Sequence, residues 1–234
     1  MQQNNREFIL IDKKDEAENI TSLFFKPSDN LHYEFKSGQY VNARPLSVSG
    51  HGKSYTISSP SYEKLICLTI KRKGAVSSAL IDFPLNHKIL LDGPYGFFYP
   101  EDNCDELVMI AGGIGVTPFY SIIKDRLNSK NKTKITLFYS NKKLKDVSFF
   151  KEFNELVKNY PQFNIVYTLT QDDTKHPTIN EYSRIGEKML KKYVVSFKKK
   201  CYYVCGSIQF VNDMWKLLKD HGVIESCIFT ESFF

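Results

Sequence analysis

The chain has 234 residues, of which 42% are hydrophobic and 25% are charged, and its formal net charge is +6. This composition is typical of a soluble globular protein, and the length allows one large domain or two of ordinary size. No apolar run approaches the roughly 20 residues of a membrane span, and the polar N-terminal residues exclude a signal peptide, so we expect the protein in the cytoplasm.

The basic residues are scattered, with small clusters at residues 71–73, 142–143 and 198–200. Nucleic-acid binding requires a basic face that carries aromatic side chains or a groove-binding helix, and the sequence indicates neither. We expect this charge to give a mild attraction for an acidic protein partner.

The five cysteines form no C-x-x-C pair, and their spacing fits neither a zinc site nor an iron–sulfur cluster, so we expect no metal. Four of them lie in or beside apolar, strand-like runs, which favours small buried side chains. Their odd number in a chain expected in the cytoplasm predicts reduced thiols. The cysteines are Cys67, Cys104, Cys201, Cys205 and Cys227.

The first hundred residues are rich in short alternating or β-branched runs, with glycine, proline, asparagine and serine between them. Runs at this spacing predict a closed barrel or a sandwich of β-strands. One short helix is expected at residues 77–81. The predicted strands cover residues 8–11, 20–26, 40–43, 54–58, 65–71 and 88–91.

The remainder of the chain alternates between strand and helix patterns, which predicts a parallel sheet with helices on both faces. Proline, asparagine and acidic residues at 99–105 mark the boundary between the two halves. The predicted strands cover residues 107–111, 134–139, 163–169, 202–204 and 227–230. The predicted helices cover residues 118–127, 148–159, 186–193 and 208–221.

Residues 107–124 (LVMIAGGIGVTPFYSIIK) join a buried strand to a helix through a glycine-rich turn. The apolar run predicts a strand buried on both faces, and Pro118 suits the first helical turn. Such a turn can hold a dinucleotide phosphate, because glycines allow a close approach and the free amides of the helix face the anion. The G-G-x-G-x-x-P pattern alone is equally compatible with a simple turn.

Residues 53–59 (KSYTISS) place a cation, an aromatic ring and several hydroxyls on one strand. Alternation places Lys53 and Tyr55 on one face and Ser54 and Thr56 on the other. Taken alone, the segment favours an edge strand that carries polar side chains and has no binding role.

A second anion site is predicted where the strand ending at Ile70 meets three cations, Gly74 and Ser77, which stands at a helix N-cap position. The alternative is an ordinary capped turn with solvated lysines. A rigid aromatic turn is expected at residues 93–98 (GPYGFF).

The order of these motifs is more informative than any one of them. G-Q-Y, K-x-Y-T-I-S-S, G-x-V-S-x-x-L, G-P-x-G-x-F, G-G-x-G-x-x-P, C-G and E-x-F follow one another from about Phe8 to Phe234. This succession resembles the ferredoxin–NADP⁺ reductase family over nearly the whole chain. The resemblance implies two domains: a six-stranded antiparallel β-barrel that binds FAD (residues 1–101) and an α/β parallel-sheet domain that binds NAD(P) (residues 102–234).

The resemblance implies that the Tyr55 ring stacks on the isoalloxazine of FAD and that Thr56 bonds the flavin near N5. Lys53 stands where the family usually has arginine on the FAD pyrophosphate. Lysine keeps the charge but loses the two-pronged hydrogen bonding of arginine, which predicts a weaker hold on FAD. The pyrophosphate would lie against Gly74, Val76 and Ser77. Further contacts are implied for Ser54, Ile70 and Lys71.

In the second domain, the resemblance implies that the nicotinamide nucleotide contacts Gly113, Gly115, Val116, Thr117 and Pro118. Thr117 would lie near the junction between nicotinamide and flavin.

Cys205 and Gly206 end a predicted buried strand at the carboxyl edge of the sheet, where parallel sheets bind ligands. The resemblance implies that Cys205 touches the nicotinamide and that Glu231 approaches the reacting atoms. The residues alone favour a packing role for Cys205 and a solvated acid at Glu231. The resemblance also implies that a C-terminal aromatic residue covers the flavin, and the candidates are Phe234 and then Phe233. A frayed or core-packed tail is the alternative.

Ser140, Asn141 and Lys142 follow a predicted strand at the place where the family contacts the adenosine ribose. An acidic residue there favours a free 2′-hydroxyl, whereas a cation favours a 2′-phosphate. Lys142 and Lys143 therefore favour NADPH over NADH.

The expected function is that of an FAD-containing oxidoreductase that transfers a hydride from NAD(P)H to flavin N5. The sequence lacks cluster cysteines and a haem domain, so we expect a separate acceptor: a ferredoxin, a flavodoxin, or an oxygenase or haem component. Two alternatives stay open. One is a flavin reductase that uses free flavin as its substrate. The other, suggested by Lys53, is a non-catalytic FAD-binding electron-transfer subunit of a larger complex.

Overall fold

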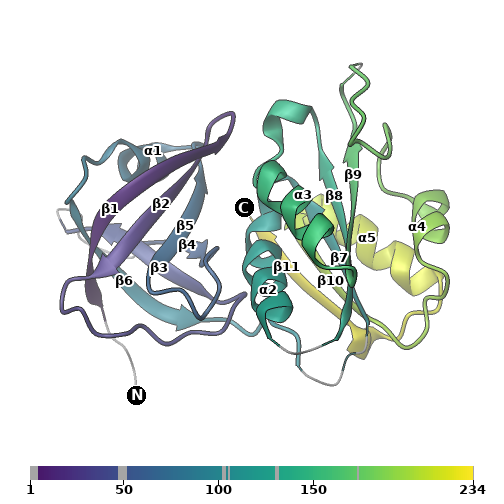
Figure 1. Cartoon of the computed structure of the whole chain (residues 1–234), viewed down its shortest axis with the longest axis horizontal. Coiled ribbons are helices and arrows are strands. Elements are labelled where there is room, and N and C mark those ends of the chain that lie inside the picture. The colour runs from purple at the N-terminus through teal and green to yellow at the C-terminus, as the bar shows by residue number, and fades with distance from the viewer. Residues whose placement is uncertain are drawn as a thin grey trace. The chain divides into compact units, whose positions relative to one another are not determined.

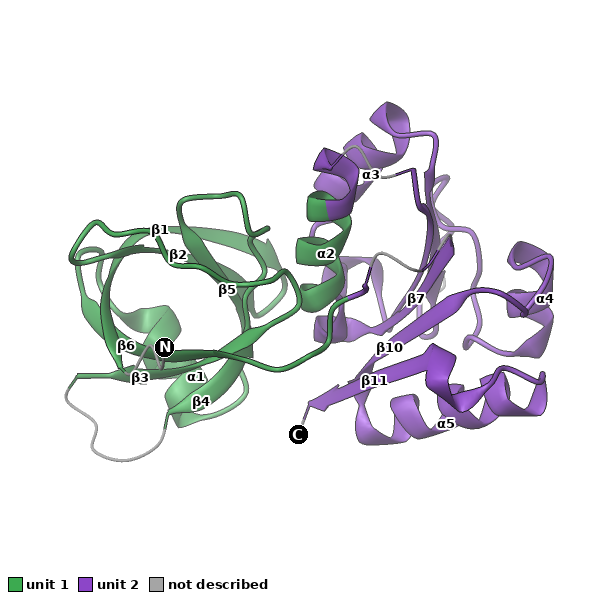
Figure 2. Ribbon diagram, turned by 90° about the horizontal axis from the view of Figure 1, so that it is seen from below, with its two compact units in different colours: residues 1–99, 117–125 green, residues 100–116, 126–234 purple. Residues whose placement is uncertain are grey.

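The computed structural model describes residues 5–46, 52–101, 104, 106–129, 132–172 and 174–233. The chain divides into two compact units, shown in different colours in Figure 2. The first unit contains Met1–Tyr99 and Thr117–Asp125, and the second contains Pro100–Val116 and Arg126–Phe234. The boundary between a FAD-binding and an NAD(P)-binding domain at residues 101 and 102 remains a proposal.

The first unit is built on a six-stranded antiparallel sheet (Figure 1). The strand order is β4-β3-β6-β1-β2-β5. An isolated bridge between Ile57 and Leu68 joins the residue after β4 to β5, so the two edges of the sheet meet as a barrel requires. The strands are β1 (Arg6–Ala17), β2 (Ile20–Pro27), β3 (Tyr40–Pro45), β4 (Lys53–Thr56), β5 (Ile66–Lys71) and β6 (Lys88–Tyr95).

The barrel core follows the two-residue period of its strands. On β1, Phe8 and Leu10 are fully buried, while the residues between and beside them are partly exposed. Helix α1 (Ala75–Asp82) contributes Leu80 and Ile81 to the same core. The barrel is therefore filled by apolar side chains rather than hollow.

Helix α1 begins two residues before the predicted start, and Ser77 is not its N-cap. Gly74 holds that position, and Ser77 is the third helical residue. The Ser77 hydroxyl accepts hydrogen bonds from the amides of Lys73 (2.9 Å) and Gly74 (3.0 Å). A hydroxyl at the third helical position can satisfy free amides of the cap, which explains why the helix starts earlier.

The predicted rigid turn at residues 93–98 begins inside a strand. Strand β6 continues through Gly93 and Pro94, which are joined by a cis peptide bond, to Tyr95. Tyr95 is the register partner of Tyr40 on β3, and the two rings lie 5.8 Å apart between centroids. Pairing with β3 at this aromatic pair extends β6 to Tyr95, whereas the predicted strand covered residues 88–91.

The second unit is built on a five-stranded parallel sheet in the order β11-β10-β7-β8-β9. Continuous apolar runs form its central strands, as burial on both faces requires. The strands are β7 (Glu106–Gly112), β8 (Lys134–Asn141), β9 (Phe163–Leu169), β10 (Cys201–Ser207) and β11 (Ile228–Phe233). The helices that follow α1 are α2 (Thr117–Asn128), α3 (Phe150–Asn159), α4 (Glu187–Tyr193) and α5 (Ile208–Asp220).

Helices cover both faces of this sheet (Figure 1). On one face, Val204 of β10 belongs to a buried cluster with Leu190 of α4 and Leu218 of α5. On the other face, Tyr139 of β8 packs against Phe153 of α3, with 6.3 Å between ring centroids. The predicted fold class, an antiparallel barrel followed by a parallel α/β sheet, is confirmed. In the described parts of the chain, no helix has the length and apolar character needed to cross a membrane.

The prediction that all cysteines are reduced is wrong for one pair. Cys104 and Cys201 form a disulfide bond, with their Cα atoms 6.1 Å apart. Cys104 precedes β7 and Cys201 begins β10, and these strands are neighbours in the sheet although 97 residues separate the two cysteines. The pairing depends on strand order, which cysteine spacing does not reveal. The free cysteines are Cys67, Cys205 and Cys227.

Candidate functional site

Strand β4 carries two buried polar groups that lack a protein partner. The Tyr55 ring is half-buried against the barrel core, and burial raises the pKa of its hydroxyl to about 12. Thr56 is only 4% exposed. Neither the Tyr55 hydroxyl nor Thr56 Oγ1 has a hydrogen-bond partner among the residues that the structure describes. Unpaired buried polar groups are costly, so a ligand that bonded them would stabilise this strand.

The other predicted flavin contacts on strands β4 and β5 differ in how much of each side chain is exposed. Lys53 and Lys71 are exposed, so their charges can reach an anion. Ser54 is exposed too, and its hydroxyl donates to Asn42 Oδ1 at 2.7 Å. Ile70 is 1% exposed and belongs to the barrel core. Only the backbone of Ile70 is therefore available to a cofactor.

The start of α1 has room for a phosphate. A Cβ atom built on Gly74 would meet no atom within 4 Å, so the backbone is open on that side. Val76 packs its side chain against the barrel core, leaving its backbone as the group that a ligand could contact. The Ser77 hydroxyl donates to the Gly74 carbonyl at 2.9 Å as well as accepting from two amides. A phosphate would have to share this hydroxyl with the turn that it already closes.

The glycine turn after β7 forms a short 3-10 helix, Gly113–Val116, before α2 begins at Thr117. Gly113 has a φ of +54°, a conformation that glycine adopts without strain. A Cβ atom on Gly115 would lie 2.4 Å from the backbone oxygen of Cys205, so only glycine fits there. The turn therefore packs directly against the end of β10. This brings Gly115 and Cys205, two of the predicted nucleotide contacts, next to each other. Val116 and Thr117 are buried and Pro118 follows in the first helical turn.

Cys205 and Glu231 are register partners on the parallel strands β10 and β11. Side chains at paired positions share one face of a sheet, so the thiol and the carboxyl lie side by side. Burial and the neighbouring Glu231 raise the pKa of the Cys205 thiol. Burial also raises the pKa of Glu231 to about 7, and its Oε2 has no hydrogen-bond partner in the described part of the chain. Glu231 is therefore not the solvated terminal acid that its position alone favours.

Gly206 faces a residue that sequence reasoning missed. A Cβ atom on Gly206 would lie 2.7 Å from the Phe210 ring, and one on Gly112 would lie 3.1 Å from it. The ring of Phe210, on α5, therefore covers two glycines at the carboxyl ends of neighbouring strands. Aromatic residues after a C-G pair carry no special signal, so sequence alone could not identify this contact.

The predicted ribose-contacting segment lies at the end of β8. Asn141 is 6% exposed, and no partner for its Nδ2 occurs among the described residues. Ser140 is partly exposed and Lys142 is exposed. A carboxylate that sequence reasoning missed lies beside this segment: Asp172 accepts a hydrogen bond from the amide of Leu144 at 2.9 Å. This bond is the main cause that lowers the pKa of Asp172, which is therefore charged at neutral pH.

Phe234 lies outside the described residues, so its predicted position over the flavin stays a prediction. Phe233 is the last residue of β11 and pairs in register with Ser207.

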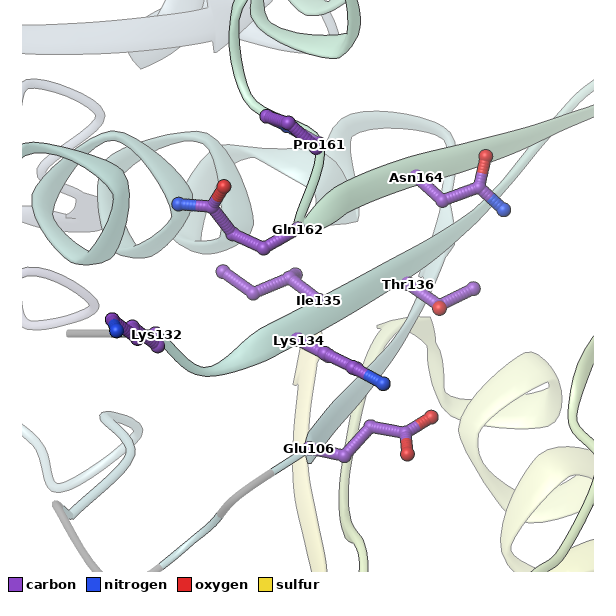
Figure 3. A pocket seen from close by; sticks show the side chains of 8 residues that line it. All are labelled: Glu106, Lys132, Lys134, Ile135, Thr136, Pro161, Gln162 and Asn164. Carbon is purple, nitrogen blue, oxygen red and sulfur yellow. The ribbon is translucent and has the colours of Figure 1, made fainter.

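A cavity of about 600 Å³ lies at the amino-terminal edge of the parallel sheet (Figure 3). Glu106 begins β7, Lys134 begins β8, Gln162 directly precedes β9, and Asn164 is the second residue of β9. Ligands of open parallel sheets bind at the carboxyl ends of the strands, where the predicted contacts lie. The cavity is thus at the opposite edge from the candidate site.

The two halves of the chain match two families of cofactor-binding domain. Residues 7–99 match the oxidoreductase FAD-binding domain, and residues 109–216 match the oxidoreductase NAD-binding domain. The chain belongs to the ferredoxin–NADP⁺ reductase family. The order of motifs in the sequence predicted this membership, which is confirmed.

The chain is similar to parts of longer proteins. The chain is 27% identical to a flavohemoprotein of Bacillus subtilis, over 97% of the chain and 58% of the relative. It is 26% identical to a glycine betaine monooxygenase reductase subunit of Chromohalobacter salexigens, over 93% of the chain and 61% of the relative. The chain thus spans about three fifths of these two relatives. It shares its fold with a ferredoxin NADP⁺ reductase of Neisseria gonorrhoeae, with a TM-score of 0.83, 21% identity and 99% of both chains covered.

The residues of this reductase-family chain fit the cofactors that the two domains imply. FAD could stack on the Tyr55 ring, bond the unpaired Thr56 Oγ1 and place its phosphates beside Gly74 and the exposed cations. A nicotinamide nucleotide could satisfy Asn141 Nδ2 and Glu231 Oε2. These unpaired atoms belong to residues for which the family resemblance implied cofactor contacts.

Proposed function

We propose that the chain binds FAD through its barrel and NAD(P)H through its parallel sheet, and acts as an NAD(P)H-dependent oxidoreductase. When bound, FAD supplies the redox chemistry: it accepts a hydride equivalent from NAD(P)H and passes electrons to an acceptor. The observation that carries the proposal is the match of both cofactor-binding domains in their family order. The protein's own contribution is to bind and align the two rings and to exclude water.

On the flavin side, the proposed roles belong to three residues of β4. Tyr55 offers the face of its ring for stacking, since the rest of the side chain rests on the barrel core. Thr56 offers a buried hydroxyl that can bond a ring nitrogen. Lys53 offers a positive charge for the pyrophosphate, with a single point of contact where arginine would give two.

On the nicotinamide side, Cys205 and Glu231 are the residues that we propose touch the reacting atoms. The thiol stays protonated at neutral pH because its pKa is raised, so it acts as a neutral packing group. Glu231 has a pKa of about 7 and can hold or release a proton under ordinary conditions. A neutral carboxyl beside the nicotinamide can donate a hydrogen bond without placing a negative charge against an electron-rich ring.

The preference between the two nicotinamide nucleotides rests on opposing groups at the end of β8. Exposed Lys142 and Lys143 favour the 2′-phosphate of NADPH. Asp172, which is bonded to the same loop, favours the free 2′-hydroxyl of NADH. We propose that NADPH is preferred, because two exposed cations outweigh one carboxylate that already accepts hydrogen bonds from two backbone amides.

The acceptor is proposed to be a separate electron carrier or a haem or oxygenase component. One relative is named a flavohemoprotein and another a monooxygenase reductase subunit. The net charge of +6 favours an acidic partner. One specific feature favours a second candidate: Lys53 in place of arginine predicts a weaker hold on FAD, as a flavin reductase that uses free flavin as its substrate would have.

Steady-state turnover tests the proposed function. Protein reconstituted with FAD is assayed with NADPH or NADH and an artificial one-electron acceptor. We expect turnover, with kcat/KM higher for NADPH than for NADH. Omitting FAD and supplying free flavin as the acceptor tests the flavin-reductase alternative, for which activity would depend on flavin concentration in the micromolar range. FAD binding without turnover would instead support a non-catalytic subunit.

A further inference from the structure

The first part of α2 is bonded to the loop that follows β4. Its residues Thr117–Asp125 belong to the first compact unit, as the barrel does (Figure 2). The Ser121 hydroxyl donates to the backbone oxygen of Ser59 at 2.7 Å. The Ser61 hydroxyl donates to both carboxylate oxygens of Asp125, at 2.9 and 3.1 Å. Two residues one helical turn apart on α2, Ser121 and Asp125, thus form hydrogen bonds with the loop that follows β4.

An ion pair adds to these hydrogen bonds. Lys124 Nζ lies 2.5 Å from Glu63 Oε1, and both side chains are partly buried. The loop is itself tied to the barrel, because the amide of Ser61 donates to Ser37 Oγ at 3.1 Å. Every second residue of the loop from Ser59 to Glu63 thus contacts α2: Ser59 and Ser61 through hydrogen bonds, and Glu63 through the ion pair.

The contact is dry as well as polar. Ser121 is 0% exposed and Ser59 is 2% exposed. The Phe119 ring lies 5.7 Å from the ring of Phe98 between centroids. A Cβ atom on Gly38 would lie 3.0 Å from the tip of Ile122, so α2 is pressed close to the barrel backbone there. Buried contacts of this kind hold a geometry more firmly than exposed ion pairs do.

The bonded loop begins immediately after the predicted flavin contacts. Ser59 lies three residues beyond Thr56, and Ser58 between them is fixed to β5 by its amide, which donates to the Cys67 oxygen at 2.8 Å. On the other side, Ser121 lies four residues beyond Thr117, on the same face of the helix one turn later. Thr56 and Thr117 are therefore linked through the hydrogen bond between Ser59 and Ser121 and the short backbone segments on either side of it.

We propose that Ser121 and Asp125 are positioning residues for hydride transfer. They hold the second and third turns of α2 against the loop after β4, which fixes Thr117 and its neighbour Pro118 in the preceding turn relative to Tyr55 and Thr56. The proposed nicotinamide contacts at the start of α2 and the proposed flavin contacts on β4 thereby keep one spacing. This inference rests on the proposed function, and it concerns residues outside the family motifs. A small misplacement of reacting rings lowers a rate steeply, so the anchor has kinetic consequences.

The pair formed by Ser61 and Asp125 gives the sharpest test, because it is only partly buried. Asp125→Ala and Ser61→Ala each remove the hydrogen bond, whereas Asp125→Asn keeps an oxygen that can accept from Ser61. Asp213→Ala is the matched control, since Asp213 is a helical aspartate of α5 bonded only to Gln209 in the part of the chain that the structure describes. Ser121→Ala tests the buried bond in the same way if that variant folds.

Two measurements are made on each variant. The first is the limiting rate of flavin reduction at saturating NAD(P)H in FAD-loaded protein, with the nucleotide dissociation constant taken from the same titration. The second is hydrogen exchange at the amides of the first turns of α2 in protein without FAD.

We expect Asp125→Ala and Ser61→Ala each to lower the limiting rate by about tenfold, with less than a twofold change in nucleotide affinity. The double variant should be no slower than either single variant, because both remove one bond. Asp125→Asn and Asp213→Ala should keep the wild-type rate. Amides in the first turns of α2 should exchange faster in the two alanine variants of the pair.

Wild-type rates in the alanine variants, together with a lower melting temperature, would show a merely structural bond and overturn the proposal. Unchanged hydrogen exchange in α2 would overturn it independently of any activity. If wild-type protein itself failed to reduce flavin, the proposed function would fail, while the exchange measurement would still decide whether the anchor holds α2.

Discussion

Tyr55 presents a ring to solvent and buries a hydroxyl that has no protein partner among the described residues. A ring held against the barrel core is already immobilised, so stacking on it costs little conformational entropy. The unpaired hydroxyl lowers the stability of the protein without FAD, and it is not required for stacking. The ring, rather than the hydroxyl, should therefore determine FAD affinity.

This view predicts different outcomes for two substitutions. Tyr55→Ala should weaken FAD binding by at least about tenfold, or about 1.4 kcal/mol, because the stacking surface is lost. Tyr55→Phe should bind FAD nearly as wild-type does. Titration of FAD into apoprotein, followed by quenching of flavin fluorescence, measures both. Equal FAD affinity in a folded Tyr55→Ala variant would show that the flavin ring lies elsewhere.

Glu231 is a second group whose behaviour is set by burial. Its pKa is raised from 4.5 to about 7 in the folded protein. Because the folded state binds the proton more tightly than the unfolded state, the free energy of unfolding should fall as pH rises from about 4.5 to 7. Each unit of pKa shift is about 1.4 kcal/mol, so the loss is on the order of 3 kcal/mol.

Glu231→Gln should remove this pH dependence and should be more stable than wild-type protein at pH 8. Urea denaturation of both apoproteins at pH 5 and pH 8 measures the effect. The difference in unfolding free energy between variant and wild type should grow with pH. A difference that stays constant between the two pH values would mean that Glu231 titrates normally.

At the residue scale, the sequence singled out candidate residues but did not describe their surroundings. It identified Glu231 and Cys205 through their motifs, yet their pairing in register and their shared burial follow from the order of strands β10 and β11. Asp172 was missed because it comes close to the end of β8 only through a loop hydrogen bond. Such contacts depend on tertiary structure, which a motif does not record.

Among the elements, the glycine turn between β7 and α2 is the most constrained. Gly115 leaves no room for a side chain, because its Cβ atom would collide with the Cys205 backbone. Gly113 has open space but a positive φ. The two glycines therefore serve different needs within one turn.

Gly115→Ala should displace the turn from the end of β10 and weaken nucleotide binding by more than tenfold. Gly113→Ala should leave the turn in place, because its Cβ atom meets no protein atom, and should cost about 1 kcal/mol of stability through backbone strain. Calorimetric titration with NADP⁺ and NAD⁺, together with thermal unfolding, separates the two effects. Wild-type nucleotide affinity in Gly115→Ala would contradict the placement of the nucleotide at this turn.

The disulfide bond ties the segment before β7 to the start of β10. Denatured protein without reductant should therefore expose three reactive thiols, from Cys67, Cys205 and Cys227, whereas reduced protein should expose five. Titration with a chromogenic thiol reagent counts them. Five thiols in protein purified and denatured without reductant would show that the pair is not bonded.

Element starts and ends show where local sequence signals compete. The predicted start of α1 was late by two residues because Ser77 resembles an N-cap, although it acts from the third helical position. Strand β6 passes through Gly93 and Pro94, which predicted a turn. The start of α1 is decided by local hydrogen bonds of the Ser77 hydroxyl, and the end of β6 by its pairing with β3.

For the whole molecule, the succession of weak motifs gave the fold class and the family, because their order is set by the architecture that holds two cofactors. Alternating apolar patterns gave the barrel, and continuous apolar runs gave the parallel sheet. The acceptor and the nucleotide preference depend on surface residues and partners, where no such constraint acts on the sequence. The α2 residues that anchor this helix to the loop after β4, Ser121 and Asp125, likewise lie outside every motif.

Anaerobic mixing of the FAD-loaded protein with NADPH tests the central claim most directly. Because the chain is proposed to align nicotinamide with flavin, the flavin absorbance near 450 nm should bleach within seconds, with about one equivalent of nucleotide oxidised per flavin. NADH should bleach it more slowly. A protein that holds FAD but keeps its yellow colour with both nucleotides would contradict the account.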